Sequence, residues 1–183
     1  MKQVSPLAFD WLLRQRLGTA QRIAIVGIGD ENSAVDRFGM EAAREIERQH
    51  LSGVRVFFAG TEPESMTGPL REYRPDHILL LDAADMGSQP GTVAFIDPER
   101  IPAGHFSTHA LPLSAVIKFI EKDTGAKVTL VGIQPDLSRD EMGLAPDGRD
   151  LLNRDLAELF AFLPATLFNP PPAILVKKES GGK

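Results

Sequence analysis

The stretch at 78–86 reads ILLLDAADM and decides how the rest of the chain is organised. Its consecutive apolar residues without alternation are typical of a strand buried on both faces, as in the centre of a parallel sheet. The run ends at Asp82, where such a strand leaves the sheet. Ligands of open α/β sheets bind beyond the carboxyl ends of the strands, so Asp82 is the first candidate site residue. The alternative is that Asp82 caps the following turn, and spacing alone does not choose between the two.

Strand and helix patterns alternate on both sides of this stretch. Further buried strands are predicted at 22–28, 54–59 and 128–133, and the better-alternating segment 91–96 is predicted as an edge strand. Amphipathic helices are predicted at 7–17, about 36–49, 69–73, 111–122 and 151–163. We expect Trp11 to pack the first helix onto the domain. This order predicts an α/β fold in which right-handed crossovers place helices on both faces of a twisted, mostly parallel sheet.

Length and composition limit the possible classes of protein. The 183 residues suit a single domain, which we place at 1–165 with an extra N-terminal helix at 1–18, followed by a flexible proline-containing tail at 166–183. A net charge of −5 argues against non-specific binding of nucleic acid. The absence of cysteine excludes disulfides, zinc–thiolate sites and cysteine nucleophiles. No apolar run approaches the roughly 20 residues of a membrane span, so we expect no membrane insertion. We also expect the protein to be cytoplasmic and monomeric.

Familiar catalytic and nucleotide-binding motifs do not fit the chain. Gly27 and Gly29 lie at the end of the first strand, but Asn32 occupies the position of the third glycine of a dinucleotide-binding fingerprint. The same loop carries Asp30 and Glu31, which would repel a pyrophosphate. A nucleotide-binding module therefore remains an alternative that only a phosphate ligand at 27–34 would support. The chain also lacks a Walker motif, an HExxH helix and a nucleophile elbow, which disfavours serine and zinc peptidases.

Oxygen and nitrogen donors remain near the predicted strand ends. If the first and third strands are neighbours, Asp36 and Asp82 face one crevice where the winding of the sheet reverses. His109 lies just before the predicted helix at 111–122. Two carboxylates and one imidazole suit a first-row divalent metal. The plainer alternatives are that Asp36 is a helix N-terminal acid and that His109 is a solvent-exposed loop residue. The remaining histidines have no acidic partner in the pattern: His50, His77 and His105.

Five segments taken together resemble a known family. They are GIGDENSAVDRFG (27–39), GTEPES (60–65), LLLDAADMGSQPG (79–91), STHALPLS (107–114) and VGIQPD (131–136). In this order they resemble the hydrogenase maturation endopeptidases, and most closely the branch that serves formate-hydrogenlyase-type hydrogenases. The resemblance spans about 22–163. It implies a single three-layer α/β/α domain, with a twisted, mostly parallel five-stranded sheet between helices.

The resemblance also implies an activity. Members of this family are peptidases that remove a C-terminal extension from the large-subunit precursor of nickel–iron hydrogenase after nickel has been inserted. Carried over by motif position, their proposed metal ligands fall on Asp36, Asp82 and His109. The nickel would then arrive bound to the precursor, which would be the protein partner. Which group acts as the base does not follow from the sequence.

Three positions depart from the pattern of the family. Asp30 replaces the usual asparagine of the first loop, Val35 replaces the first acid of that loop, and Phe58 replaces an acid near the end of the second strand. The proposed ligands are retained, but two polar groups beside them are lost. The second hypothesis is therefore a non-cleaving, metal-recognising assembly factor or chaperone of hydrogenase with the same fold.

Overall fold

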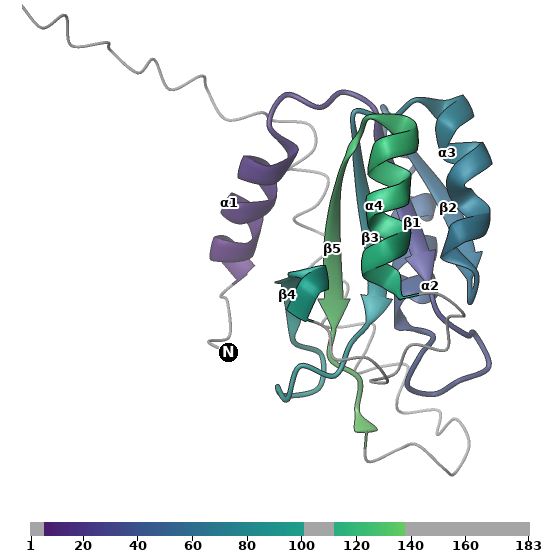
Figure 1. Ribbon diagram of the computed structural model, residues 1–183. Coiled ribbons are helices and arrows are strands. Elements are labelled where there is room, and N and C mark those ends of the chain that lie inside the picture. Colours follow the sequence, from purple (N-terminus) through teal and green to yellow (C-terminus); the bar gives the residue numbers. More distant parts are fainter. Residues whose placement is uncertain (1–5, 101–111, 138–183) are drawn as a thin grey trace, which may run out of the picture.

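A computed structural model describes residues 6–100 and 112–137 (Figure 1). Within these ranges the helices and strands alternate as the sequence pattern predicts. They are α1 (Pro6–Leu17), β1 (Ile23–Ile28), α2 (Phe38–Arg48), β2 (Val54–Gly60), η1 (Pro63–Met66), α3 (Thr67–Tyr73), β3 (His77–Ala83), β4 (Val93–Ile96), η2 (Pro98–Arg100), α4 (Leu113–Thr124) and β5 (Lys127–Ile133).

The strands form one five-stranded sheet in the order β2-β1-β3-β5-β4. All neighbours are parallel except β4, which pairs antiparallel with β5 at the edge. The predicted edge strand is thus confirmed. β1 pairs directly with β3, with Ile25 opposite Leu79. The winding of the sheet therefore reverses between β1 and β3, and their carboxyl ends form a topological switch point.

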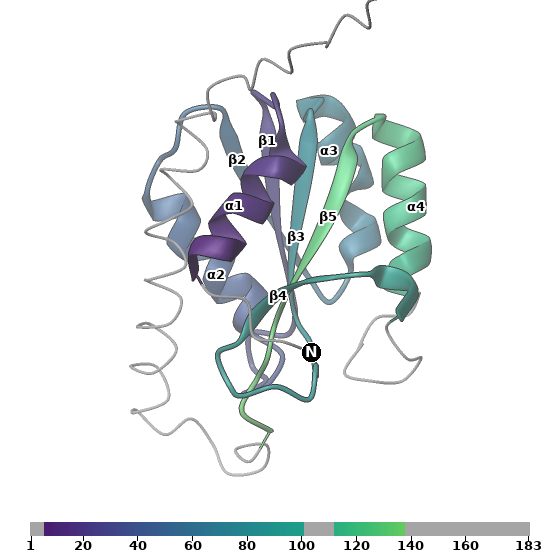
Figure 2. The ribbon, with the colours of Figure 1, turned by 90° about the vertical axis from the view of Figure 1, so that its left-hand side faces the viewer.

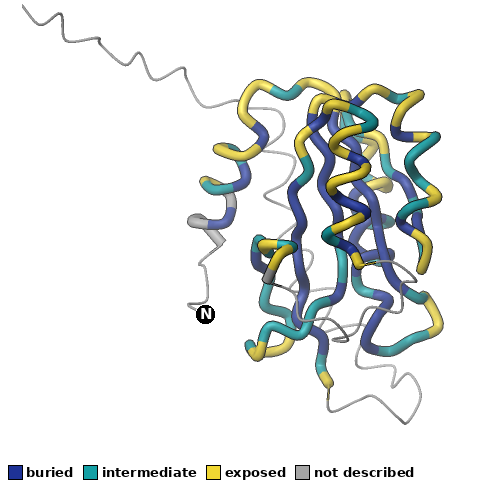
Figure 3. Tube along the Cα trace, viewed as in Figure 1, coloured by how far each residue is buried: buried dark blue, intermediate teal, exposed yellow. Residues whose placement is uncertain are grey.

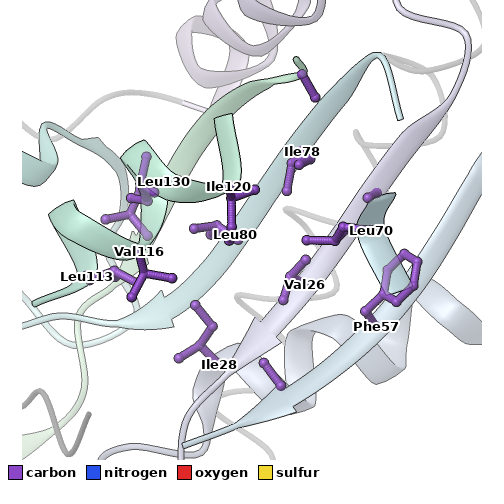
Figure 4. Close-up of a cluster of buried hydrophobic side chains, with 14 residues drawn as sticks. Val26, Ile28, Phe57, Leu70, Ile78, Leu80, Leu113, Val116, Ile120 and Leu130 are labelled. Atoms are coloured by element: carbon purple, nitrogen blue, oxygen red, sulfur yellow. The ribbon is translucent and has the colours of Figure 1, made fainter. Parts of the chain in front are cut away.

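Helices cover both faces of the sheet, which confirms the three-layer α/β/α prediction. Viewed from the side, α1 and α2 lie on one face and α3 and α4 on the other (Figure 2). The face of α3 and α4 holds one core cluster, which includes Ile78, Leu80 and Ile120 (Figure 4). The opposite face holds a second cluster, to which α1 contributes Phe9 and Leu13.

β3 is central because its residues supply both clusters alternately. Ile78 and Leu80 belong to the cluster beneath α3 and α4, whereas Leu79 and Leu81 belong to the cluster beneath α1 and α2. Burial on both faces explains why the sequence of this strand does not alternate in hydrophobicity (Figure 3). Residues two apart on a strand point to the same face of the sheet, so Asp82, like Leu80, is on the face that α3 and α4 cover.

Three local predictions are corrected by the structure. Trp11 does not anchor α1, because 59% of it is exposed, and Phe9 instead stacks on Phe95 with ring centroids 4.4 Å apart. The helix predicted at 69–73 begins earlier, at Thr67, and η1 precedes it. α2 begins at Phe38, so Asp36 lies in the preceding turn rather than within the helix.

Several predictions lie outside the described residues. They concern His109, His105, the helix at 151–163 and the tail at 166–183, and they remain predictions, as does the boundary of the domain at 165. Within the described part, no helix is long and apolar enough to cross a membrane.

Candidate active site at the carboxyl edge of the sheet

Asp36 is held in place by the loop that follows β1. The loop turns back so closely that a Cβ on Gly29, whose φ is 129°, would lie 1.8 Å from the Asp36 carbonyl oxygen. The backbone N–H of Asp30 donates to Asp36 Oδ2 at 3.0 Å, and the N–H of Asp36 donates to Ser33 Oγ at 3.2 Å. Asp36 is only 4% exposed. Its carboxylate is therefore fixed before any ligand arrives.

The start of α2 lies against the carboxyl ends of β1 and β3. A Cβ on Gly39 would lie 2.1 Å from the carbonyl oxygen of Leu81 and 2.3 Å from that of Ile28. Only glycine permits this approach, because backbone atoms of both strands fill the space. The contact places the turn that carries Asp36 over the switch point, beside the last residues of β3. Asp36 and Asp82 are thus brought together, as the spacing predicted.

The two carboxyl groups affect each other electrostatically. Burial, followed by the charge of Asp36, raises the pKa of Asp82 from 3.8 to about 8, and a hydrogen bond from the backbone of Ala83 opposes this rise. A pKa near 8 favours the protonated form of the Asp82 carboxyl group at neutral pH. A pair of carboxyl groups in which one keeps its proton is ready to accept a cation, which would displace that proton.

His109, the third predicted ligand, is outside the described residues. The described chain resumes immediately before α4, whose first residue, Leu113, follows His109 by four positions. α4 packs against η1 and covers the face of the sheet on which Asp82 lies. Within 6–100 and 112–137, no group of three acidic, histidine or cysteine side chains is placed to hold a metal ion. The described residues thus bring together two of the three predicted ligands.

Two of the three departures from the family pattern, Val35 and Phe58, put an apolar side chain where the resemblance implies an acid. Val35 is buried, at 6% exposure, directly before Asp36. Phe58 is half-buried near the end of β2, with the guanidinium carbon of Arg44 5.6 Å from the centre of its ring. Arg44 also forms an ion pair with Glu31 of the first loop. These contacts occupy the positions where the resemblance implies acidic groups.

Three polar residues near this edge are not predicted as site residues by the sequence pattern. Arg37 is buried beside Asp36, and its Nε lies 3.3 Å from Glu41 Oε1. Glu64 of η1 has one carboxylate oxygen, Oε2, that is buried without a hydrogen-bond partner among the described residues. Gln134, directly after β5, is 2% exposed. Of the three, Gln134 has a sequence feature that could have indicated a site residue. It directly follows the buried strand predicted at 128–133, within the segment VGIQPD (131–136) that resembles the family.

Comparison with known proteins identifies the family. A family described as hydrogenase maturation protease, HycI, matches residues 40–158. The chain belongs to this family. The matched range contains Asp82 and His109 and begins after Asp36. The family resemblance read from the sequence is thus confirmed, and the protein is a peptidase of hydrogenase maturation.

Individual relatives of this hydrogenase maturation protease agree with the assignment. A Methanocaldococcus jannaschii protein that carries a hydrogenase maturation protease name is 32% identical over 134 residues, which cover 69% of this chain and 79% of that protein. The hydrogenase 3 maturation protease of Escherichia coli K12 is 40% identical over 83 residues, 45% of this chain and 53% of its own length.

Solved structures show the same fold. The crystal structure of the NiFe hydrogenase maturation protease HycI from Thermococcus kodakarensis KOD1 has a TM-score of 0.73 at 27% identity, covering 86% of this chain and 99% of that one. The solution structure of the endopeptidase HycI from Escherichia coli has a TM-score of 0.61 at 28% identity, covering 78% and 91%.

Proposed function

We propose that the protein removes the C-terminal extension of a nickel–iron hydrogenase large-subunit precursor after nickel insertion. In this proposal Asp36, Asp82 and His109 contact the nickel that the precursor carries, so the metal is part of the substrate. One observation carries the proposal: Asp36 and Asp82 meet at the switch point, and the charge of Asp36 helps to raise the pKa of Asp82 to about 8. Membership of a family of hydrogenase maturation proteases supplies the substrate class.

The position of α4 supports His109 as the third group. α4 covers the face of the sheet on which Asp82 lies, and α4 also packs against η1 at the end of β2. A short segment leads from His109 to the first residue of this helix. An imidazole delivered there would complete two carboxylates with a nitrogen donor, a set that suits a first-row divalent metal.

The proposed mechanism uses these groups to position the precursor. Asp82 would release its proton to water when it meets the nickel of the precursor, while Asp36 stays oriented by the N–H of Asp30. Docking would place the scissile peptide bond beside the two carboxylates. Either a carboxylate activates water as a general base, or the bound metal polarises the carbonyl.

Alanine variants test the proposal. We expect Asp36→Ala, Asp82→Ala and His109→Ala each to abolish release of the C-terminal peptide from nickel-loaded precursor, as followed by mass spectrometry. His50→Asn is the matched control, because His50 is exposed and follows the end of α2 distant from the site. It should process the precursor at the unmodified rate. Normal processing by both Asp82→Ala and His109→Ala would refute the assignment.

A non-cleaving assembly factor is the second candidate, and the surroundings of Val35 and Phe58 favour it. Because Val35 and Phe58 are apolar, the pair of carboxyl groups has no further acidic neighbour at those two positions. A protein of this kind would bind nickel-loaded precursor and leave it intact. Co-purification of a stable complex that contains unprocessed precursor would favour this candidate, whereas release of the C-terminal peptide would exclude it.

A further inference from the structure

Gln134 has the most extensively bonded buried side chain described at this edge of the sheet. It directly follows β5 and is 2% exposed. Its Oε1 accepts hydrogen bonds from the backbone N–H groups of Met86, at 2.6 Å, and Ser88, at 3.2 Å. Its Nε2 donates to Asp85 Oδ1 at 3.2 Å and to the carbonyl oxygen of Pro135 at 3.3 Å. Both ends of the amide are therefore used.

The backbone around Gln134 holds the same segment. The N–H of Gln134 donates to the carbonyl of Thr92 at 2.8 Å, and its carbonyl accepts from the N–H of Gly91 at 2.9 Å. The N–H of Ala84 donates to the carbonyl of Ile133 at 2.9 Å. The whole connection between β3 and β4, at 84–92, is thus folded around the residue that follows β5.

Asp85 completes the arrangement from within this connection. Its Oδ1 accepts both from Gln134 Nε2 and from the N–H of Gly87, at 3.0 Å. Gly87 has a φ of 61°, a left-handed conformation that suits glycine. The turn therefore depends on a donor from residue 134, and a carboxylate at that position would face the carboxylate of Asp85.

This connection begins two residues after Asp82. The pairing of β3 with β5 continues through Asp82 and Ala83, opposite Gly132 and Ile133, and Gln134 fixes the chain immediately beyond that pairing. Strand ends are where local opening starts, and a buried clamp directly past the end suppresses it. Without the clamp, the last residues of β3 could separate from β5 and carry Asp82 out of place.

We propose that Gln134 is a positioning residue of this protease. Its amide fixes the 84–92 connection and thereby holds Asp82 in the geometry that the reaction needs. The effect on activity rests on the function proposed above, whereas the effect on the connection does not. A displacement of about 1 Å at a catalytic group can lower a rate on the order of 100-fold, so loss of the clamp should act on kcat.

The first variants separate positioning from folding. Gln134→Met keeps the length of the side chain and removes every hydrogen bond of the amide. Gln134→Glu keeps the acceptor for Met86 and Ser88 but opposes Asp85. We expect both variants to stay folded and to lose kcat by about 10- to 100-fold with little change in KM. In Gln134→Met, which lacks the acceptor, the amide protons of Met86 and Ser88 should also exchange faster.

A complementary change should restore the clamp. In the double variant Asp85→Asn, Gln134→Glu, the new asparagine offers a donor to the new glutamate and keeps an acceptor for the N–H of Gly87. We expect kcat to recover well above the value of Gln134→Glu alone. The comparison also needs the single variant Asp85→Asn. If the loss of kcat in the double variant equals the product of the losses in the two single variants, the sites are independent and the direct pairing is contradicted.

The matched control lies at the other end of the same two strands. His77 Nε2 and Thr129 Oγ1 form a buried hydrogen bond 2.9 Å long between β3 and β5. Thr129→Val should lower stability and leave kcat unchanged. If Gln134→Met and Gln134→Glu also keep full kcat, or if kcat falls equally in Thr129→Val, Gln134 acts only through stability and the proposal is overturned.

Amide exchange keeps this test separate from the proposed function. If the unmodified protein fails to process nickel-loaded precursor, the proposed function is wrong, and exchange alone then decides the clamp. Faster exchange at Met86 and Ser88 in Gln134→Met, with unchanged exchange in the centre of β3, would support it. Unchanged exchange at both amides would overturn it.

Discussion

Asp82 makes the free energy of unfolding depend on pH in an unusual direction. Its pKa is 3.8 in an unfolded chain and about 8 in the folded protein. Between these values the folded state holds a proton that the unfolded state has lost, so stability falls as pH rises from about 4 to about 8. We expect Asp82→Asn, which cannot ionise, to gain on the order of a few kcal/mol over the unmodified protein by pH 8, and little at pH 4.

Urea unfolding across this pH range measures the difference between the two proteins. Asp76 is a control of opposite sign, because hydrogen bonds from the N–H groups of Arg22 and Gln21 lower the pKa of its carboxyl group. Its stabilising contribution is present above the unfolded pKa and is lost as pH falls below it. The free energy of unfolding of Asp76→Asn should therefore fall furthest below that of the unmodified protein near neutral pH. Parallel curves for Asp82→Asn and the unmodified protein would contradict the environment described for Asp82.

At the residue scale, the sequence predicts site residues better than it predicts their supports. Asp36 and Asp82 could be named because each lies near the carboxyl end of a recognisable buried strand. Gln134 also follows such a strand, but its importance depends on the folding of a connection some 45 residues earlier in the chain. His77 is similar: burial lowers its pKa to about 4, with Lys127 and Arg16 adding to the effect, and its partner Thr129 is on another strand. Such pairings follow from register, which a single sequence does not specify.

At the scale of elements, the site depends on how closely α2 approaches β1 and β3. A Cβ on Gly39 would meet backbone oxygens that cannot move without disturbing both strands. We expect Gly39→Ala to destabilise the protein by roughly 1–3 kcal/mol or more and to reduce processing, because the turn with Asp36 is displaced. Thermal unfolding and precursor cleavage measure the two effects.

Gly68 provides the comparison for this substitution. It lies within α3, and a Cβ there would have no atom within 4 Å. Gly68→Ala should therefore stabilise the protein by about 0.4–1 kcal/mol and leave processing unchanged. Equal effects of alanine at the two positions would show that the close approach of α2 is not needed.

Most elements follow from hydrophobic periodicity, and the exceptions have physical reasons. η1 was missed because a short 3₁₀ turn that begins at Pro63 has no apolar period to detect. Periodicity predicts that Trp11 packs α1 onto the domain. The helix instead buries Phe9, Leu13 and Leu17 against the sheet, which leaves Trp11 on the outer side. Periodicity identified the helix but not which side of it is buried.

At the scale of the molecule, the strand order creates the site. The sequence predicted an α/β sheet with helices on both faces, but the adjacency of β1 and β3 could only be assumed from it. That adjacency joins two loops that lie more than 40 residues apart in the chain. The site is therefore a property of the topology, and the family assignment agrees with it, because solved members of the family share the fold.

The central claim is that this site recognises nickel carried by a hydrogenase precursor. The most direct measurement incubates the purified protein with matched nickel-loaded and nickel-free precursors and follows the mass of each by mass spectrometry. We predict that the C-terminal peptide is released from the nickel-loaded precursor only, and not at all by Asp82→Ala. Release at equal rates from both precursors, or release by Asp82→Ala at the unmodified rate, would contradict the claim.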